Sequence, residues 1–515
     1  MYFHSVNSYP LTGYPNYKST YLGTPGTVDF TCIDSGSAPF CGEMTPIAHV
    51  SGLSTQTSIT GTTSAITSPQ TGFIAKFVSD PLKGVSSISA NTWTFNCASD
   101  MSSTNANFWI NGLYIYVFRP DVNGGSIVGA IFENYSTAGG SNPASTAEKV
   151  NHYTISGNAV SGVSDDDVII VELWSNTTQG MATSYTVHAY FDGGVVTTTN
   201  GTTVSDHASF LETPQALTFN NQCYPRVIAK GSTTTNTSSY ASSSFTPSAN
   251  TLVLFIGAVT IGTSSFSTSF SGTNYTWSGF SGASNLNGIG TQTSVVVLGV
   301  LSGVSPSSET MNVTMLGPGA SGTGFTYIVL EISNYKTSLP ISYLSLNGGN
   351  CTGVLTTAPI ATQTLTTLGS VNNVSVKSGS LPWCDRNMLL TACFRYGDST
   401  AMTSNRASNG FSFLAGQANS SPTCSLDVFV KRHTRYPSFT DHTGPIISTN
   451  QITFPVIASD GGTGIVEIPA DNSQTIDLTF IYSSGENDVV VSDSTASQSY
   501  KERIAGVVTN RLRDS

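Results

Sequence analysis

The sequence predicts an all-β protein that is divided into several antiparallel β-sandwich domains. Runs of β-branched and aromatic residues, each about the length of a strand, recur along the chain between clusters of Gly, Asn, Asp and Ser. No such run alternates with a helical pattern of about 10–15 residues, so a parallel α/β fold is not expected. The chain has 515 residues, which is more than one ordinary hydrophobic core supports.

The first 71 residues are expected to form an extended arm followed by a linker. Six aromatic residues fall within the first 21 positions, and prolines interrupt them, which disfavours a helix or a central strand. Such an arm would bury its rings on a neighbouring chain or on its own first domain. The small, polar stretch 51–72 is expected to be the linker. The predicted assembly anchors are Tyr2, Phe3, Tyr9, Tyr14, Tyr17 and Tyr21.

Residues 72–225 are expected to form the first β-sandwich, of a jelly-roll-like kind. Its clearest strand patterns are the apolar runs at 108–118, 167–174 and 184–191. A polar stretch at 229–250 separates them from the next apolar runs.

Five strand patterns then occur twice in the same order, which predicts a duplicated module. The paired stretches are 250–257 with 387–394, 275–280 with 409–414, 294–300 with 425–431, 308–315 with 473–480, and 325–335 with 487–495. The spacing between the copies lengthens after the third pair, so the second copy is expected to carry an insertion at 432–469. The predicted modules are 226–336 and 337–499, and a short helix is expected at 500–515, where apolar residues recur on one face.

The composition limits the partners of the chain. The net charge of -11 argues against nucleic acid, because binding phosphates needs clustered Lys and Arg. No run of 18 apolar residues occurs, so membrane insertion is not expected. The N-terminus lacks the basic and apolar regions of a signal peptide, which predicts synthesis in the cytoplasm. Charged residues make up only 10%, so Ser, Thr, Asn and Gly must cover much of the surface.

Several of these patterns resemble known modules. The series "NTLVLFIG", "YTWSGF", "VVVLGVL", "TMNVTM" and "YIVLEISNY" resembles an immunoglobulin-like β-sandwich module of bacteriophage structural proteins and secreted bacterial surface proteins. The segments "TWTFN", "IYVFRP", "VIIVELW" and "SDHASFLETP" are similar to a β-sandwich of phage virion proteins. The resemblance implies virion surface architecture, of the tail fibre, spike or capsid decoration type. It implies no reaction, no cofactor and no particular site residues.

The expected insertion at 432–469 is the best candidate for a recognition surface. It combines aromatic and charged side chains in a polar setting, and loops on rigid sandwiches commonly carry binding. A contact between subunits explains the same residues equally well, and a metal site made by its histidines is a third alternative. The candidate binding residues are Arg432, His433, Arg435, Tyr436, Phe439, Asp441 and His442.

Three other groups of residues are candidates for a calcium site, a catalytic triad and a pair of glycosidase carboxylates. Asp165, Asp166 and Asp167 precede a strand, and clustered carboxylates hold Ca²⁺ in some loops. Consecutive Asp side chains in a turn diverge, however, so a solvated turn is the favoured explanation. Asp206 and His207 lie close to Ser209, but a catalytic triad requires spatial geometry, and no G-x-S-x-G motif occurs.

Glycoside hydrolysis would need two facing carboxylates. Candidates are Glu172, Asp192 and Glu212, and nothing in the sequence singles out a pair.

The function expected from the sequence is that of a non-enzymatic structural or adhesive protein on a virion surface, with no cofactor. Its expected partners are other virion proteins, copies of itself in a homo-oligomer such as a trimer, and a glycan of the host surface. The first alternative is a secreted cell-surface adhesin that binds carbohydrate. The second is an enzyme that depolymerises glycans.

Overall fold

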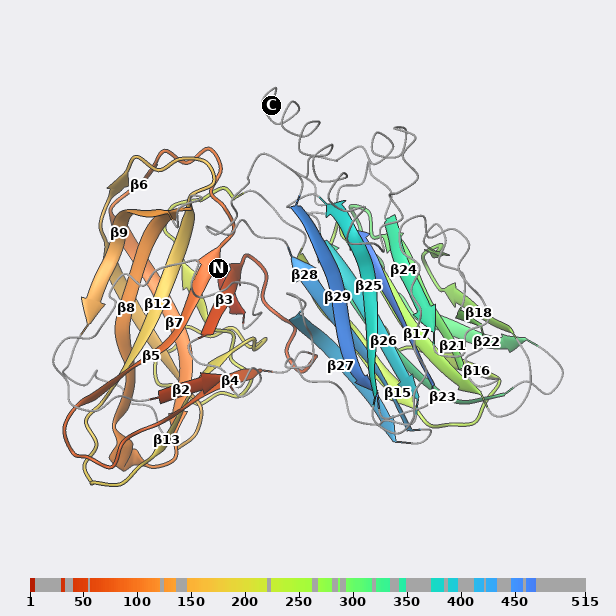
Figure 1. The fold of residues 1–515 in the computed structure, drawn as a ribbon, viewed down its shortest axis with the longest axis horizontal. Helices are drawn as coiled ribbons and strands as arrows, with labels where there is room; N and C mark the ends of the chain where they lie inside the picture. The colour runs from red at the N-terminus through yellow and green to blue at the C-terminus, as the bar shows by residue number, and fades with distance from the viewer. Residues whose placement is uncertain are drawn as a thin grey trace. The chain divides into compact units, whose positions relative to one another are not determined.

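The structure, a computed structural model, describes 18 segments of the chain. They are residues 1–4, 29–32, 40–53, 56–120, 125–135, 146–219, 224–261, 267–279, 286–287, 293–316, 321–333, 342–348, 372–383, 388–396, 412–420, 423–432, 446–456 and 460–468. The fold is nearly all-β, with several antiparallel sheets, which confirms the fold class predicted from the sequence (Figure 1). The chain divides into two compact units at Asn220 and Asn221. The helix predicted at 500–515 lies outside the described residues.

The first unit contains 14 described strands and the one-turn 3-10 helix η2 (Thr104–Ala106). The strands are β1 (Tyr2–His4), β2 (Asp29–Cys32), β3 (Phe40–Thr45), β4 (Thr57–Thr62), β5 (Gln70–Ser79), β6 (Ser87–Ile88), β7 (Asn91–Met101), β8 (Phe108–Arg119), β9 (Ser126–Tyr135), β10 (Lys149–Gly157), β11 (Val160–Ser161), β12 (Val168–Thr177), β13 (Thr186–Phe191) and β14 (Phe210–Glu212).

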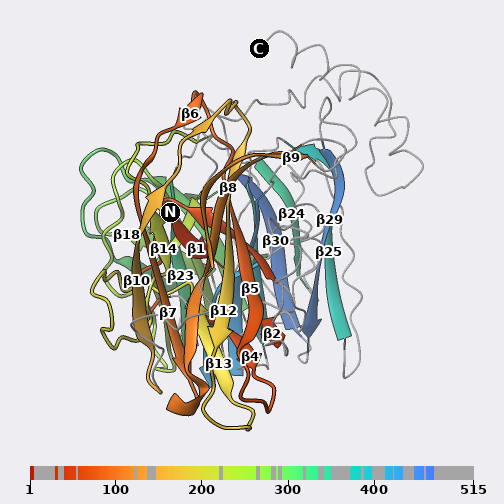
Figure 2. The ribbon, with the colours of Figure 1, turned by 90° about the vertical axis from the view of Figure 1, so that its left-hand side faces the viewer.

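Twelve of these strands form one continuous sheet. Their order is β2-β4-β13-β7-β14-β1-β3-β5-β12-β8-β9, with β10 beside β7. Neighbours are antiparallel except β3 and β5, which run parallel. The central strands β5, β12 and β8 run beside each other in the view onto this unit (Figure 2).

The sheet folds over so that its two halves share one hydrophobic core. Buried side chains from β7 and β13, such as Phe95 and Phe191, join the same cluster as Phe77 of β5, Ile115 of β8 and Val171 of β12. Each of these strands alternates, so every second residue faces this core. The short strand β1 contributes Phe3, whose ring stacks on Phe77 at a centroid distance of 4.6 Å.

The three strands β5, β12 and β8 are apolar on both faces. Tyr116, Phe118 and Ile170 point away from the shared core, yet they are buried in a second cluster with Val168 and Trp174. A strand that is buried on both sides is usually a nearly continuous apolar run. This explains the pattern "VIIVELW" at 168–174, in which the one charged residue, the buried Glu172, lies opposite the buried Lys76 of β5.

The first 71 residues belong to the sheet of the first unit more fully than the sequence suggests. Four strands, β1 to β4, fall within this range. β1, β3 and β4 pair with strands of residues 70–212, and β2 pairs with β4. Of the two alternatives for the aromatic residues, Tyr2 and Phe3 follow the second, because they lie on a strand within the sheet of their own first domain. Phe3 is 1% exposed inside the core, and Tyr2 lies against Phe210 at a centroid distance of 5.4 Å. Tyr9, Tyr14, Tyr17 and Tyr21 lie outside the described residues.

The second unit begins with a β-sandwich made of two sheets. Strands of the larger sheet have the order β15-β23-β17-β21-β19, with β20 beside β21, and the smaller sheet is β16-β22-β18. Their bounds are β15 (Tyr224–Thr233), β16 (Ser239–Ala241), β17 (Leu252–Ile261), β18 (Ser267–Gly272), β19 (Ser278–Gly279), β20 (Leu286–Asn287), β21 (Thr293–Leu301), β22 (Met311–Leu316) and β23 (Gly322–Ser333). Phe255 and Phe325 of one sheet and Val313 of the other meet in its core.

A second sandwich follows with the same strand order. Its larger sheet is β24-β30-β26-β28-β27, and β25 pairs with β29 as β16 pairs with β22. The bounds are β24 (Ser342–Gly348), β25 (Asn372–Trp383), β26 (Met388–Tyr396), β27 (Ser412–Ser420), β28 (Thr423–Arg432), β29 (Ile446–Val456) and β30 (Asp460–Ile468). The duplication predicted from the sequence is therefore present in the topology.

The final two strand pairs differ from the prediction. The counterpart of β22 is β29, not the stretch 473–480, and the counterpart of β23 is β30, not 487–495. The register supports this assignment. Met388 pairs with Ile468 as Leu252 pairs with Ile332, and Leu389 pairs with Glu467 as Val253 pairs with Glu331. The segment 432–469 is consequently not an insertion, because it holds β29 and β30, the counterparts of β22 and β23.

Hydrogen bonds join the two sandwiches within the second unit. The Asn419 side-chain amide donates to the Thr233 carbonyl at 3.0 Å, and the Ser232 hydroxyl donates to the Ala418 carbonyl at 3.2 Å. The larger sheet of the first sandwich is also buried on the face opposite to its core, where Leu254 and Ile256 have no exposed surface. Both observations indicate that this sheet is an internal layer of the second unit.

Glu309 organises the turn between β18 and β19. Its buried carboxylate accepts hydrogen bonds from the backbone N–H groups of Thr273, Asn274 and Tyr275 at 2.5, 3.0 and 2.8 Å. The amide of Thr310 donates to it as well, at 2.7 Å. Burial alone would raise the pKa of Glu309, but these hydrogen bonds outweigh burial and hold the pKa below its ordinary value.

We expect Glu309→Gln to destabilise the first sandwich of the second unit by about 2–3 kcal/mol at pH 7, because it leaves buried donors without an anionic acceptor. Chemical denaturation monitored by Trp fluorescence measures this change. Because the pKa of Glu309 is lower in the folded protein than the unfolded value of 4.5, its ionised carboxylate stabilises the fold above that pH. This stabilisation is lost as the pH falls, so the difference in unfolding free energy between wild type and variant should shrink in acid. Glu212→Gln is the control, because Glu212 is exposed. An equal loss in both variants would contradict the assignment.

Candidate functional site

The predicted recognition residues are only partly described. Arg432 is the last residue of β28, and its backbone lies opposite Met388. The other six, His433, Arg435, Tyr436, Phe439, Asp441 and His442, lie outside the described residues. Because 446–456 and 460–468 are strands, the recognition surface expected from an inserted loop is reduced to the connection at 433–445.

The three consecutive aspartates do not converge on a common point. Asp167 is 1% exposed and forms a bidentate pair with Arg119, with both N–O distances at 2.8 Å. Asp165 accepts a hydrogen bond from the amide of Gly84 at 2.6 Å, and Asp166 has a positive φ of 72°. Each residue thus serves the turn before β12 in a different way. The structure gives no support for a calcium site here.

The residues Asp206, His207 and Ser209 do not form a triad. The hydroxyl of Ser209 donates to the Tyr190 carbonyl at 2.6 Å, and the carboxylate of Asp206 accepts from the Gly52 amide at 3.0 Å. His207 has no exposed surface, and neither of its ring nitrogens makes a hydrogen bond. Ser209 and Asp206 therefore hold neighbouring segments in place, while the His207 ring is packed in the interior.

The carboxylates considered for glycoside hydrolysis occupy different environments. Glu172 has no exposed surface and accepts a hydrogen bond from the indole of Trp174 at 2.9 Å, on β12. Glu212 is exposed at the end of β14. Asp192 follows β13 and belongs to a cluster with two histidines, described next.

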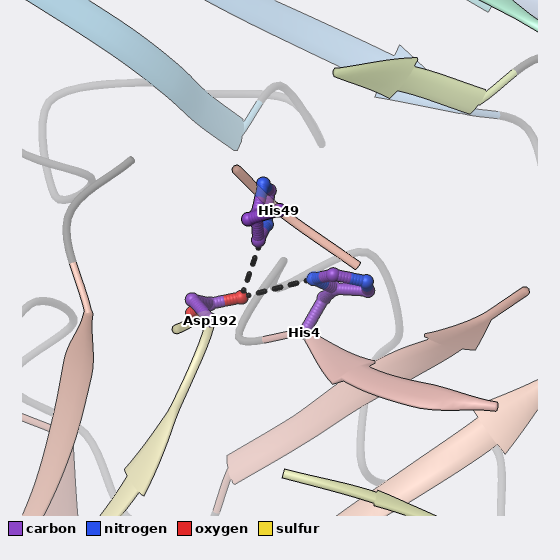
Figure 3. A group of neighbouring side chains, drawn as sticks. All are labelled: His4, His49 and Asp192. Atoms are coloured by element: carbon purple, nitrogen blue, oxygen red, sulfur yellow. Dashed lines mark hydrogen bonds and ion pairs between the residues drawn. The ribbon is translucent and has the colours of Figure 1, made fainter. Parts of the chain in front are cut away.

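Three side chains from distant parts of the chain meet beside β1 (Figure 3). His4 is the last residue of β1, His49 lies beyond the end of β3, and Asp192 follows the last residue of β13. Cross-strand pairing of β1 with β3 and β14 fixes the position of His4. Neither histidine is among the predicted site residues, because their separation from each other and from Asp192 matches no motif.

A tight turn places Asp192 in this cluster. Asp192 has a φ of 65°, in the left-handed region that Asp tolerates better than most residues. Two glycines follow, and both are closely packed. A Cβ on Gly193 would lie 2.2 Å from the His207 carbonyl oxygen, and one on Gly194 would lie 2.1 Å from the Ser51 amide nitrogen. The turn therefore requires glycine at both positions, and its packing fixes the carboxylate.

The two imidazoles converge on one carboxylate oxygen. The His4 Nδ1 atom lies 3.3 Å from Asp192 Oδ1, and the His49 Nε2 atom lies 3.6 Å from the same oxygen. Their rings meet edge-on at a centroid distance of 4.5 Å. The side chains of His4, Asp192 and His49 are 6%, 8% and 13% exposed. Among the described residues, this is the one set of three His, Cys, Asp or Glu side chains whose ligand atoms all lie within 4.8 Å.

The electrostatic environment favours an ionised carboxylate in this cluster. Burial alone would raise the pKa of Asp192, but hydrogen bonding and charge interactions with His4 and His49 outweigh burial and lower it. Burial lowers the pKa of His49, as does the neighbouring His4, against the opposing influence of Asp192 and Glu43. Glu43 is itself buried and pairs across the strands with His4.

A second histidine–aspartate pair lies on β13 and β7. His188 Nδ1 is 2.5 Å from one oxygen of Asp100, and the Tyr190 hydroxyl donates to the other at 2.6 Å. Burial, followed by this hydrogen bond, raises the pKa of Tyr190. The pair joins adjacent strands on the same sheet face, which is a cross-strand contact of the kind that stabilises sheets.

Cys97 is a buried free thiol on β7. Burial raises its pKa to about 12, so it is protonated and unreactive at neutral pH. The side chains of the other seven cysteines lie outside the described part of the chain.

Comparison with known proteins gives this chain no relatives: no family model matches it, and neither does any curated protein. No helix within the described ranges has the length and apolar character needed to cross a membrane.

We expect acid to destabilise the first unit through His207. Burial lowers the pKa of His207 to about 4 from the ordinary 6.5, so the unfolded chain takes up this proton first. Stability should therefore fall between pH 6.5 and 4, by at most about 3 kcal/mol from this residue. Urea unfolding of the wild type and of His207→Leu at pH 7.5 and 4.5 measures the difference. A variant that loses as much stability in acid as the wild type would refute this expectation.

Proposed function

We propose that this protein is a non-enzymatic structural and adhesive component of a virion surface. The observation that carries the proposal is the duplicated sandwich, in which β24-β30-β26-β28-β27 repeats the order β15-β23-β17-β21-β19. Repeated modules extend a particle surface or present several equivalent loops, and multivalency turns weak contacts into firm attachment. The low content of charged residues, 10%, supports close packing of such modules against neighbours.

The buried polar groups support a scaffold role. Asp167, Glu309 and Glu331 are all buried, and each is engaged in holding a turn or a strand. Glu331, for example, binds Arg226 and accepts from the Ser248 amide at 2.7 Å. Buried carboxylates that accept hydrogen bonds from backbone groups stabilise the fold.

We assign assembly to the part of the N-terminal segment that follows β1. Phe3 lies in the core of its own unit, so the candidates for contact with another virion protein or with a second copy are Tyr9, Tyr14, Tyr17 and Tyr21. Tyr is common at interfaces because it buries a large ring and retains a polar hydroxyl. A homo-oligomer such as a trimer would result if the partner is another copy.

The first test is the location of the native protein. We expect an antibody raised against the purified protein to label particles from a density gradient of infected cells, seen by immunogold electron microscopy. The protein should sediment with the particle fraction. Recovery only in the soluble medium, bound to carbohydrate, would instead favour a secreted adhesin. A fall in the viscosity of a host polysaccharide upon addition of pure protein would establish a depolymerase.

The second test concerns the tyrosines. Changing Tyr9, Tyr14, Tyr17 and Tyr21 together to Ser should reduce incorporation into particles at least about tenfold, because each lost ring removes a buried apolar contact. Quantitative immunoblotting of purified particles measures this, with circular dichroism to verify the fold. Val304→Ser is the control, since Val304 is 80% exposed in the second unit. Undiminished incorporation of the tyrosine variant would exclude this segment as the anchor.

A further inference from the structure

We propose that His4, His49 and Asp192 bind a divalent first-row transition-metal ion, with Zn²⁺ as the best fit, and that this ion fastens β1 to the rest of the first unit. The ligand atoms are His4 Nδ1, His49 Nε2 and Asp192 Oδ1 (Figure 3). This metal site is independent of the virion role proposed above.

The proton positions around His4 leave its Nδ1 atom free to be a ligand. The hydroxyl of Thr45 donates to the Ile47 carbonyl oxygen at 3.0 Å, so it can only accept from His4. The His4 Nε2 atom lies 2.9 Å from that hydroxyl and 3.1 Å from the same carbonyl oxygen. Both neighbours are acceptors for His4, hence Nε2 carries a proton. In the neutral ring, Nδ1 then holds a lone pair directed at Asp192.

Two acceptors facing each other at 3.3 Å repel unless a positive charge lies between them. One explanation is a second proton on His4, which makes the ring an imidazolium. That proton satisfies the contact with His4, and an Nε2–H group on a neutral His49 ring would satisfy the second contact, at 3.6 Å. A single metal ion satisfies all three groups at once. Protons and a metal ion are therefore the two arrangements that the experiments below must distinguish.

The separations agree with tetrahedral coordination. Zinc binds imidazole nitrogen and carboxylate oxygen at about 2.0–2.2 Å, so two ligands of a tetrahedral ion lie about 3.4 Å apart. The two nitrogen–oxygen distances here are 3.3 and 3.6 Å. The third separation, between the histidine nitrogens, is within 4.8 Å.

The donor set selects the class of ion. Two imidazoles and one carboxylate suit Zn²⁺ and its neighbours, whereas Ca²⁺ and Mg²⁺ prefer oxygen ligands. The bonds from His4 Nε2 to Thr45 and Ile47 are outer contacts of the kind that fix the tautomer of a metal-binding histidine. Glu43, buried beside His4 in the sheet, adds negative charge close to the cation.

The location indicates what the ion does. The three ligands belong to segments that are far apart in the sequence and meet only in the folded unit. An ion bound to all three would cross-link β1, the segment after β3 and the turn after β13. Because such a site is absent from the unfolded chain, binding adds directly to folding stability.

Metal binding can be tested with the 515-residue chain. After treatment with a chelator and dialysis, ZnCl₂ is titrated in competition with a chromophoric chelator. We expect one saturable site per chain, at least tenfold weaker in His49→Gln and Asp192→Asn. Asn tolerates the left-handed conformation of residue 192, so this variant keeps the turn. His152→Gln is the control, since His152 lies on β10 and bonds to Asn96 at 2.8 Å.

Thermal unfolding supplies a second measurement. Zinc should raise the melting temperature of the wild type by several degrees, and Asp192→Asn should lose this rise while remaining folded without metal. Equal zinc affinity in wild type and Asp192→Asn would overturn the proposal. So would the absence of a saturable site together with ¹⁵N shifts that show a doubly protonated His4 ring, because the imidazolium then accounts for the geometry.

Discussion

The architecture of the first unit depends on the pairing of one very short strand. β1 lies between β14 and β3, and it is the link through which the two halves of the twelve-stranded sheet become continuous. Backbone hydrogen bonds hold it on the β14 side, where the amide of Phe3 donates to the Ser209 carbonyl at 2.9 Å. The ring of Phe3 enters the shared core, and His4 reaches the cluster with Asp192. A strand of three residues gains little from its own ladder, so side-chain packing must supply most of its stability.

Long apolar strands were predictable from the sequence, whereas short strands and contacts between distant residues were not. The runs at 108–118 and 167–174 became β8 and β12, because strands buried on one or both faces have an obvious pattern. Tyr2 and Phe3 were assigned to an arm, since three residues beside a proline-rich stretch show no alternation. The final strands of the second module were misplaced because "QITFPV" and "GTGIVEI" carry weaker patterns than their counterparts. The sequence identifies Asp192 only as one carboxylate among several. His4 and His49 lie beside it because of the strand topology, which the sequence does not reveal.

The two modules of the second unit share a backbone plan and differ in their polar details. In the first, Arg226 stands opposite Glu331 in the register of β15 and β23. In the second, the corresponding position opposite Glu467 is Ser342. The glutamate thus recurs at the same place in the ladder while its cross-strand neighbour changes. Duplicated modules diverge most readily where a side chain contributes to one contact and the backbone supplies the rest.

The pairing of Tyr2 with Phe210 has a consequence for biosynthesis. A ribosome delivers the chain from its N-terminus, so β1 is made first and must wait for its partner strand to emerge. At typical rates of about 5–20 residues per second, this wait is on the order of 10–40 seconds. During that time β1, β3 and β5 lack β14, the neighbour through which β1 connects them to the other half of the sheet. The sheet of the first unit is therefore completed only late in synthesis.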